Sequence, residues 1–238
     1  RESMEFQKIS SPSLRELFVE QLQHMILSGK LKIGEKLPSE RQLAEMMQVS
    51  RAVVNGGISD LEKMGFVHVK ARSGTYVADY RRKGTIETLL AIMKYNGGSL
   101  RNEEIRSIFE VRIALDTLAA RLCVDSLSDE QINILYEKVC EMKDAQKMSE
   151  AVQAAFEFQH EFALMSNNAL IPLIIQSFKS PIFAMWERYC ALYGLEALYE
   201  NNYKMWTYIA NRDTEGVIKW VESSMKNCIE GDQQIYYE

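Results

Sequence analysis

The stretch SERQLAEMMQVSRAVVNGGISDLEKMGFVHVKARSGTYV, residues 39–77, changes its hydrophobic period once, and that change decides the fold. As far as Met64, apolar residues recur three and four positions apart, which predicts helices. Ser39 and Ser50 stand where two such helices begin, and a serine hydroxyl at that position can cap the first turn. Beyond Met64, apolar and polar residues alternate around residues 71–74, which predicts a two-stranded hairpin with a basic tip.

A further helix is expected over residues 13–28, where apolar side chains form one face and Gly29 follows as a stop. Three helices followed by a hairpin make a winged helix-turn-helix, whose third helix enters the major groove of DNA. We therefore expect a winged helix-turn-helix DNA-binding domain over residues 1–80 and a linker over residues 81–84.

From Thr85 onward the pattern is helical throughout and shows no alternation typical of strands. Helices are expected at residues 85–95, 102–125, 128–146, 149–166, 169–191, 195–211 and 213–230. The fold class is therefore mainly α: the winged domain is followed by a bundle of six or seven helices over residues 85–238.

The net charge of −5 is divided unevenly along the chain. Residues 1–83 carry 14 Lys and Arg against 10 Asp and Glu, whereas residues 84–238 carry 14 against 23. A basic front and an acidic rear indicate two domains with different partners.

Four scattered cysteines without a CxxC pair are typical of reduced thiols in a cytoplasmic protein. No stretch looks like a signal peptide, and no apolar run reaches the roughly 18 residues needed to cross a membrane. We expect a cytoplasmic location and no membrane partner.

Residues 26–77 contain, in this order, G-x-L-x-x-G-x-x-L-P-S-E-R-x-L-A, a V-S-R turn, an L-E-x-x-G exit and an S-G-T-Y-V wing. With these motifs the segment resembles the N-terminal domain of the GntR family of bacterial transcription regulators. It implies double-stranded DNA as the partner, contacted near the start of the second helix, at the start of the recognition helix and at the wing tip. The residues expected to contact DNA are Ser39, Arg41, Ser50, Arg51, Asn55, Arg72, Ser73 and Gly74. Arginine is the commonest reader of guanine, because its fork matches O6 and N7.

The recognition helix departs from the family pattern at Asn55-Gly56-Gly57, where relatives have a triplet like Arg-Glu-Ala. Asn55 either reads adenine in place of the missing arginine or is simply solvated. Each glycine inside a helix costs roughly 1 kcal/mol relative to alanine. The pair either loosens the helix until DNA binds or permits close packing against the core, and the sequence leaves both interpretations open.

Three stretches of the rear segment are distinctive: FEVRIALDTLAARLC (109–123), FALMSNNALI (162–171) and MWTYIANRDTEGVIKWVESSM (205–225). They are similar to the FCD effector domain of the FadR subfamily of GntR proteins. Many FCD domains bind a divalent metal through one Asp and three His. Two registers are possible, one placing Ala155 and Gln159 at the first two ligand positions and the other placing Phe156 and His160 there.

In both registers the later histidine positions fall near Asn202 and Ser224, so at least three ligands are lost. We therefore expect no metal and no cofactor. Arg112 occupies the family position that lies near the effector, and it either binds an anionic or amphipathic effector or forms an internal salt bridge with Asp116. The residues expected to bind the effector are Arg112, Gln159, His160, Arg188 and Asn202. Aromatic side chains are expected mainly in the core, with a possible role in lining a ligand cavity: Phe156, Phe158, Phe162, Tyr189, Tyr193, Tyr203 and Trp206.

The predicted function is an effector-responsive transcription regulator that binds a palindromic operator as a homodimer. One alternative is a DNA-architectural protein whose bundle only dimerises, which would show no ligand-dependent rise in melting temperature. The other is a helical enzyme with an attached DNA-binding module. No G-x-S-x-G, H-E-x-x-H or paired-carboxylate motif stands out in the chain, so we expect no enzymatic activity.

Overall fold

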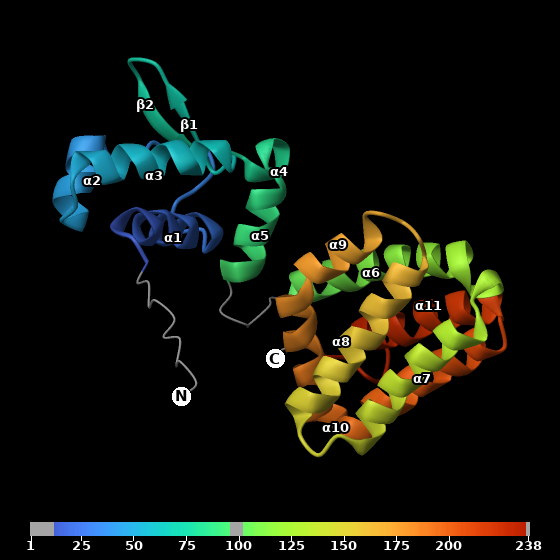
Figure 1. Cartoon of the computed structure of the whole chain (residues 1–238). Coiled ribbons are helices and arrows are strands. Elements are labelled where there is room, and N and C mark those ends of the chain that lie inside the picture. Colours follow the sequence, from blue (N-terminus) through green and yellow to red (C-terminus); the bar gives the residue numbers. More distant parts are fainter. Residues whose placement is uncertain (1–11, 96–101, 237–238) are drawn as a thin grey trace, which may run out of the picture. The chain divides into compact units, whose positions relative to one another are not determined.

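The computed structural model describes residues 12–95 and 102–236, and the chain divides into two compact units, residues 1–97 and 98–238 (Figure 1). The predicted fold class is confirmed: a winged helix-turn-helix precedes an all-helical bundle. Within the described residues, no helix is both long and apolar enough to cross a membrane.

The front unit contains the three expected helices and the hairpin. Its elements are α1 (Leu14–Leu27), α2 (Glu40–Met47), α3 (Arg51–Lys63), β1 (Val67–Lys70), β2 (Gly74–Val77), α4 (Tyr80–Lys83) and α5 (Ile86–Tyr95). α1 packs against α3 through side chains that are almost fully buried, among them Phe18, Leu22, Val54, Ile58 and Leu61. This packing fixes α3 on the core side and leaves its other face exposed.

The helix starts follow the expected capping chemistry. Ser13, Ser39 and Ser50 are the N-caps of α1, α2 and α3, and each hydroxyl accepts a backbone N–H of the first turn. Gln42 completes a capping box with Ser39, so glutamine takes the place that glutamate holds more often. The turn between α2 and α3 begins at Gln48, whose left-handed backbone (φ 52°) ends α2.

The wing is a two-stranded antiparallel sheet. Val67 pairs with Val77 and Lys70 with Gly74, so the predicted hairpin and its tip are confirmed. Arg72 and Gly74 have positive φ values of 61° and 125° at this tip. The turn therefore depends on glycine at position 74, since residues with a side chain seldom adopt so large a positive φ.

Residues 80–95 differ from the expected linker and bundle helix. α4 is a single helical turn capped by the Asp79 side chain, and α5 packs against α1 of the front unit. The ring of Tyr95 lies edge-on to His24 with centroids 4.9 Å apart, and the Thr88 hydroxyl donates to the Met64 carbonyl. α5 therefore groups with the front unit, because its apolar face lies on the front core.

The rear unit is a bundle of α-helices with one short 3-10 turn. Its elements are α6 (Asn102–Cys123), the turn η1 (Val124–Ser126), α7 (Asp129–Asp144), α8 (Met148–Met165), α9 (Ile171–Ser177), α10 (Lys179–Ala210) and α11 (Thr214–Glu230). A break after Ser177 divides the helix expected at 169–191 into α9 and the first part of α10. The break expected at Gly194 is present, because the backbone of this residue is not helical (φ 87°, ψ 165°), and α10 therefore comprises two helical segments that meet at this kink.

The core of the bundle is apolar and aromatic. Its fully buried side chains include Phe158, Phe162, Leu135, Ile171, Ile175, Ile182 and Ile209. α6 packs against α11 and α8, and α10 packs against α7, α8 and α11. The polar residues on the inner faces of α6, α8, α10 and α11 therefore face the interior of the bundle.

Candidate functional site

The exposed start of α3 and the adjacent start of α2 carry five of the residues expected to contact DNA. Arg51 is the first residue of α3 and its side chain is exposed, directly after the cap Ser50. Asn55 lies one turn further along the same exposed face, and its amide is 3.5 Å from the Glu40 carboxylate. On α2, the Arg41 guanidinium is 2.9 Å from Glu45, an exposed pair that costs little to break.

The wing tip carries the remaining three, with Arg72 exposed and the Ser73 hydroxyl 2.7 Å from the Tyr76 hydroxyl. Two lysines that were not expected from the sequence lie beside them. The ammonium of Lys70 is 4.9 Å from the centre of the Tyr76 ring, and that of Lys36 is 5.9 Å away. Lys70 lies at an outward position of its strand, so the strand pattern could have revealed it as a wing residue. Lys36 lies far from the wing in sequence and reaches it through an isolated bridge with Tyr76.

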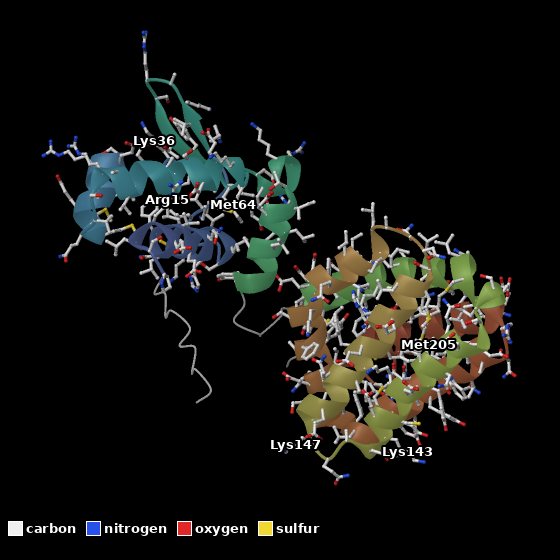
Figure 2. The ribbon with its side chains drawn as sticks, viewed as in Figure 1. Arg15, Lys36, Met64, Lys143, Lys147 and Met205 are labelled. Atoms are coloured by element: carbon white, nitrogen blue, oxygen red, sulfur yellow. The ribbon has the colours of Figure 1, made fainter. Side chains whose placement is uncertain are left out.

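The two glycines of the recognition helix lie against α1. A Cβ at Gly57 would overlap the ring of Phe18, which is 2% exposed in the core. A Cβ at Gly56 would lie 3.1 Å from the guanidinium carbon of Arg15. Figure 2 labels Arg15 in the front unit. Its guanidinium forms a two-point ion pair with Asp60, with Nε 2.6 Å from Oδ2. The glycines therefore permit close packing of α3 on α1, the second of the two interpretations.

Replacing Gly57 with Ala is expected to destabilise the front unit by about 1–3 kcal/mol, because overpacking of Phe18 outweighs the gain in helix propensity. Gly56→Ala is the matched control. Its methyl group displaces only the end of the Arg15 side chain, so its effect should stay within about 1 kcal/mol. Urea denaturation of both variants measures the difference. Equal stability of the two would contradict the packing of Phe18 on Gly57.

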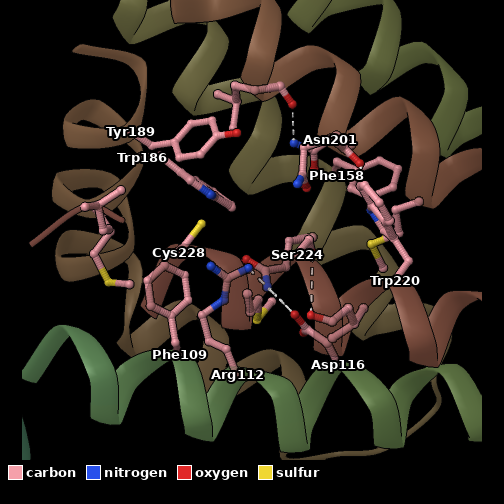
Figure 3. Close-up of a pocket in the computed structure, with 18 residues that line it drawn as sticks. Phe109, Arg112, Asp116, Phe158, Trp186, Tyr189, Asn201, Trp220, Ser224 and Cys228 are labelled. Atoms are coloured by element: carbon pink, nitrogen blue, oxygen red, sulfur yellow. Dashed lines mark hydrogen bonds and ion pairs between the residues drawn. The ribbon is translucent and has the colours of Figure 1, made fainter. Parts of the chain in front are cut away.

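A cavity of about 60 Å³ lies inside the rear unit, between α6, α8, α10 and α11. Its polar lining comprises Arg112, Asp116, Gln159, Asn201, Asn202 and Ser224. Its aromatic lining comprises Phe109, Phe158, Trp186, Tyr189 and Trp220. Figure 3 shows Arg112 and Asp116 pointing from α6 into this space, with Trp186 and Trp220 on opposite sides of it.

Arg112 and Asp116 form a buried ion pair one helical turn apart. Both residues are at most 5% exposed, and a guanidinium nitrogen of Arg112 lies 3.6 Å from a carboxylate oxygen of Asp116. The guanidinium also stacks on Trp186, 5.0 Å from the ring centre. The amide of Gln159 donates to the same carboxylate oxygen at 2.8 Å. The internal salt bridge, one of the two alternatives for Arg112, is therefore present, and the same side chain lines the cavity.

Two polar atoms at this pair are not satisfied by the protein. Within the described residues, Arg112 Nε and Gln159 Oε1 are buried and have no hydrogen-bond partner. One is a donor and the other an acceptor, so a polar molecule in the cavity can bind both. Burial raises the pKa of the Asp116 carboxyl, and the charge of Arg112 and the Gln159 hydrogen bond oppose that rise.

The cavity brings together three of the five residues expected to bind an effector: Arg112, Gln159 and Asn202. The other two lie away from the cavity lining. His160 stacks on Phe156 with ring centroids 5.8 Å apart, and Arg188 donates to the Tyr236 carbonyl at 3.1 Å. Of the two residues that the registers offer, Gln159 lines the cavity and His160 does not.

The same register bears on the family's metal site. Gln159, Asn202 and Ser224 stand at the expected histidine positions and line the cavity. Amide and hydroxyl oxygens compete weakly for transition metals, so this donor set does not fit such an ion. Over residues 12–95 and 102–236, no group of three or more His, Cys, Asp or Glu side chains is placed to hold a metal.

The aromatic lining was only partly expected. Phe158 and Tyr189 line the cavity, whereas Trp186 and Trp220 were not singled out. The Trp220 indole donates to the Asn201 carbonyl at 3.0 Å, which fixes its ring at the cavity wall. Helical spacing places both tryptophans on inward faces but cannot distinguish a cavity wall from a filled core.

Comparison with known families gives two matches that together cover most of the chain. Residues 14–77 match the family described as bacterial regulatory proteins, gntR family, and residues 107–227 match the FCD domain. The second match alone covers half of the chain.

Curated relatives are transcriptional regulators. The uncharacterised HTH-type regulator YcbG of Bacillus subtilis is 27% identical over 74% of this chain and 72% of its own length. LutR of the same organism is 30% identical over 62% of this chain and 65% of its own length. The regulator Mce2R of Mycobacterium tuberculosis is 32% identical over 57% of this chain, and the match spans 56% of Mce2R.

Among solved structures, Lar of Listeria monocytogenes has a TM-score of 0.60 at 15% identity, covering 93% of this chain and 97% of Lar. At this identity the likeness shows a shared fold alone.

Proposed function

Because the chain belongs to the GntR family of bacterial transcriptional regulators and carries an FCD domain, we propose that it binds a palindromic operator as a homodimer under the control of a small molecule. The family and its named relatives are DNA-binding regulators rather than enzymes. The dimer, the operator and the chemistry of the effector are the content of the proposal.

The observation that carries the DNA side is the exposed Arg51 at the start of α3. In winged helix-turn-helix proteins the first residues of the recognition helix reach base edges. We assign base contact to Arg51 and Asn55, and support at the start of α2 to Ser39 and Arg41. The wing residues Arg72, Ser73 and Gly74, together with Lys36 and Lys70, are assigned to phosphates or the minor groove. Ser50 holds the helix start as its cap.

An apolar stripe on α6 supports the homodimer. Val111, Leu118 and Leu122 are 43%, 39% and 48% exposed and recur seven and four residues apart, so they lie on one face of the helix. Exposed apolar faces of this kind mark interaction surfaces. Two copies of one helix face can bury each other about a two-fold axis, because such an interface is self-complementary.

A two-fold dimer explains how small winged domains bind tightly. Each domain alone covers few phosphates, and joining two of them raises the effective concentration of the second at its half-site. The symmetry of the dimer then requires an inverted repeat in the DNA.

The cavity of the rear unit supports a small anionic or amphipathic effector. Arg112 offers its unpaired Nε to an anionic group, and Gln159 Oε1 accepts from a donor group of the same molecule. Asn202 and the aromatic side chains complete the wall. Without a metal ion, Arg112 is the cation that such an effector meets in this cavity.

The effector acts by differential affinity for two arrangements of the dimer. A ligand shifts an equilibrium only by the ratio of its affinities for the two states. A cavity of about 60 Å³ is small for a metabolite, so binding requires a rear unit that is more open than this one. The effector therefore binds the open rear unit more tightly than the closed one, and this difference in affinity shifts the dimer between its two arrangements.

Arg51→Ala tests the DNA assignment. The variant is expected to weaken operator binding by roughly 1–3 kcal/mol while binding to random DNA changes much less, because a lost base contact affects only the correct sequence. Fluorescence anisotropy on both DNAs at one salt concentration measures this. Arg106→Ala, which removes an exposed arginine from the rear unit, is the matched control for charge. Equal weakening on both DNAs would assign Arg51 to phosphate, and no effect would remove it from the interface.

A further inference from the structure

The cavity has one wall that is not a helix. α11 ends at Glu230, and residues 231–236, here called the strap, continue without regular structure. Within the described part of the chain, the other lining residues of the cavity belong to α6, α8, α10 or α11, and Ile235 alone belongs to the strap. Its side chain is 1% exposed, so the strap inserts one apolar residue into the cavity.

A few hydrogen bonds hold the strap in place. The Tyr193 hydroxyl donates to the Gln234 carbonyl at 2.7 Å, and Arg188 donates to the Tyr236 carbonyl at 3.1 Å. The backbone N–H of Ile235 donates to the Cys228 carbonyl at 3.3 Å. Two of these three bonds come from side chains of α10, at positions that are not fully buried.

The helical walls are held much more firmly than the strap. Moving Arg112 or Trp220 means unpacking a long helix from a core of buried aromatic and branched side chains. Moving Ile235 means exposing one fully buried side chain and breaking a small number of hydrogen bonds, which include those of Asn227 with Asp232 and Gln233. Segments with few buried contacts open first, since local opening requires only the loss of the contacts of that segment.

We infer that the strap is the movable wall of the effector cavity and that Ile235 is the plug through whose withdrawal a small molecule reaches Arg112. The inference rests on the proposed effector site, but the opening of the strap can be measured without any effector. It also accounts for the small closed volume of the cavity, because the Ile235 side chain fills part of the space beside Cys228.

Thiol labelling of the full chain measures that opening. Cys228 lines the cavity behind the strap, whereas Cys123 and Cys190 are buried elsewhere in the rear unit. Burial raises the pKa of each of these three thiols to about 11, so each is protonated and reacts slowly while it stays buried. N-ethylmaleimide is added without effector, and modification of each cysteine is followed by mass spectrometry.

Tyr193→Phe removes the hydroxyl that donates to Gln234 and is expected to speed labelling of Cys228 about twofold to tenfold, as loss of one hydrogen bond shifts an opening equilibrium. Ile235→Ala should speed it at least as much. Tyr199→Phe, on the same helix, is the control and should change nothing. Labelling of Cys123 and Cys190 should stay constant in every variant.

Unchanged labelling of Cys228 in Tyr193→Phe would overturn the inference. So would equal acceleration of all three cysteines in that variant, because the whole bundle would then be opening. If Ile235→Ala fails to fold, the labelling of Cys228 in Tyr193→Phe alone tests the inference. The strap could open although no small molecule changes DNA binding. That result would support this inference and contradict the proposed function.

Discussion

Replacing Arg112 with Ala is expected to destabilise the rear unit by about 3–5 kcal/mol, because it leaves the Asp116 carboxylate buried without its partner. Arg112 is one of the groups that lower the pKa of Asp116, so its loss lets burial raise that pKa further. In the folded variant the protonated form of the Asp116 carboxyl then has the lower free energy. Urea denaturation at several pH values measures both effects.

The sign of the pH dependence follows from the direction of the shift. A carboxyl whose pKa is higher in the folded state binds more protons there, so stability falls as pH rises from its unfolded pKa through its folded pKa. The variant should therefore lose more stability than the parent chain over that window. A loss below about 1 kcal/mol at neutral pH would contradict a buried ionised pair, since exposed pairs contribute that little.

A double variant separates the contribution of Arg112 to stability from its proposed role in binding the effector. Arg112→Met combined with Asp116→Leu removes both charges and keeps apolar volume, so most of the lost stability should return. The double variant should still fail to respond to effector, because the proposed cation is gone. A response equal to that of the parent chain would remove Arg112 from the effector site.

Leu118→Glu is expected to weaken operator binding by about 10²- to 10⁴-fold, the range gained when a second site is held at high effective concentration. Leu118 lies in the middle of the apolar stripe of α6, and a carboxylate there would have to be buried between two copies without a partner. Light scattering should show a monomer, and anisotropy should show the loss of affinity. The winged domain itself should keep its stability, because the substitution lies in the other unit.

Leu192→Glu is the matched control, since this leucine of α10 is 44% exposed and gains the same charge. It should remain dimeric and bind the operator as the parent chain does. A Leu118→Glu protein that stays dimeric would place the interface on another surface. A parent chain that is monomeric at the concentrations that bind DNA would contradict the dimer altogether.

The winged domain was predictable because its signals are local. A serine before each helix and a change of period at the wing act over a few residues, and the structure confirms Ser39, Ser50 and the hairpin. The membership of α5 in the front unit was not predictable, because its apolar face has the same sequence pattern whichever core it covers. Gly194 was predictable as a helix end, because glycine adopts the positive φ that divides α10 into two helical segments there.

The candidate effector site was predictable where charge made a residue conspicuous. Arg112 on an inward helix face needs a partner, and Asp116 one turn later supplies it. Trp186 and Trp220 carried no such signal, because helical spacing gives core and cavity wall the same appearance. Ile235 was the least predictable, since one apolar residue in a segment without periodicity does not show where the chain folds back.

We propose that this chain recognises a symmetric DNA sequence through two winged domains. Selection from a pool of duplexes with a randomised segment of about 30 base pairs, roughly three helical turns, tests this recognition. We expect enrichment of one inverted repeat, with Arg51→Ala relaxing the sequence at symmetry-related positions in both half-sites. Recovery of a single unrepeated motif, or binding that varies with salt but enriches no sequence, would contradict it.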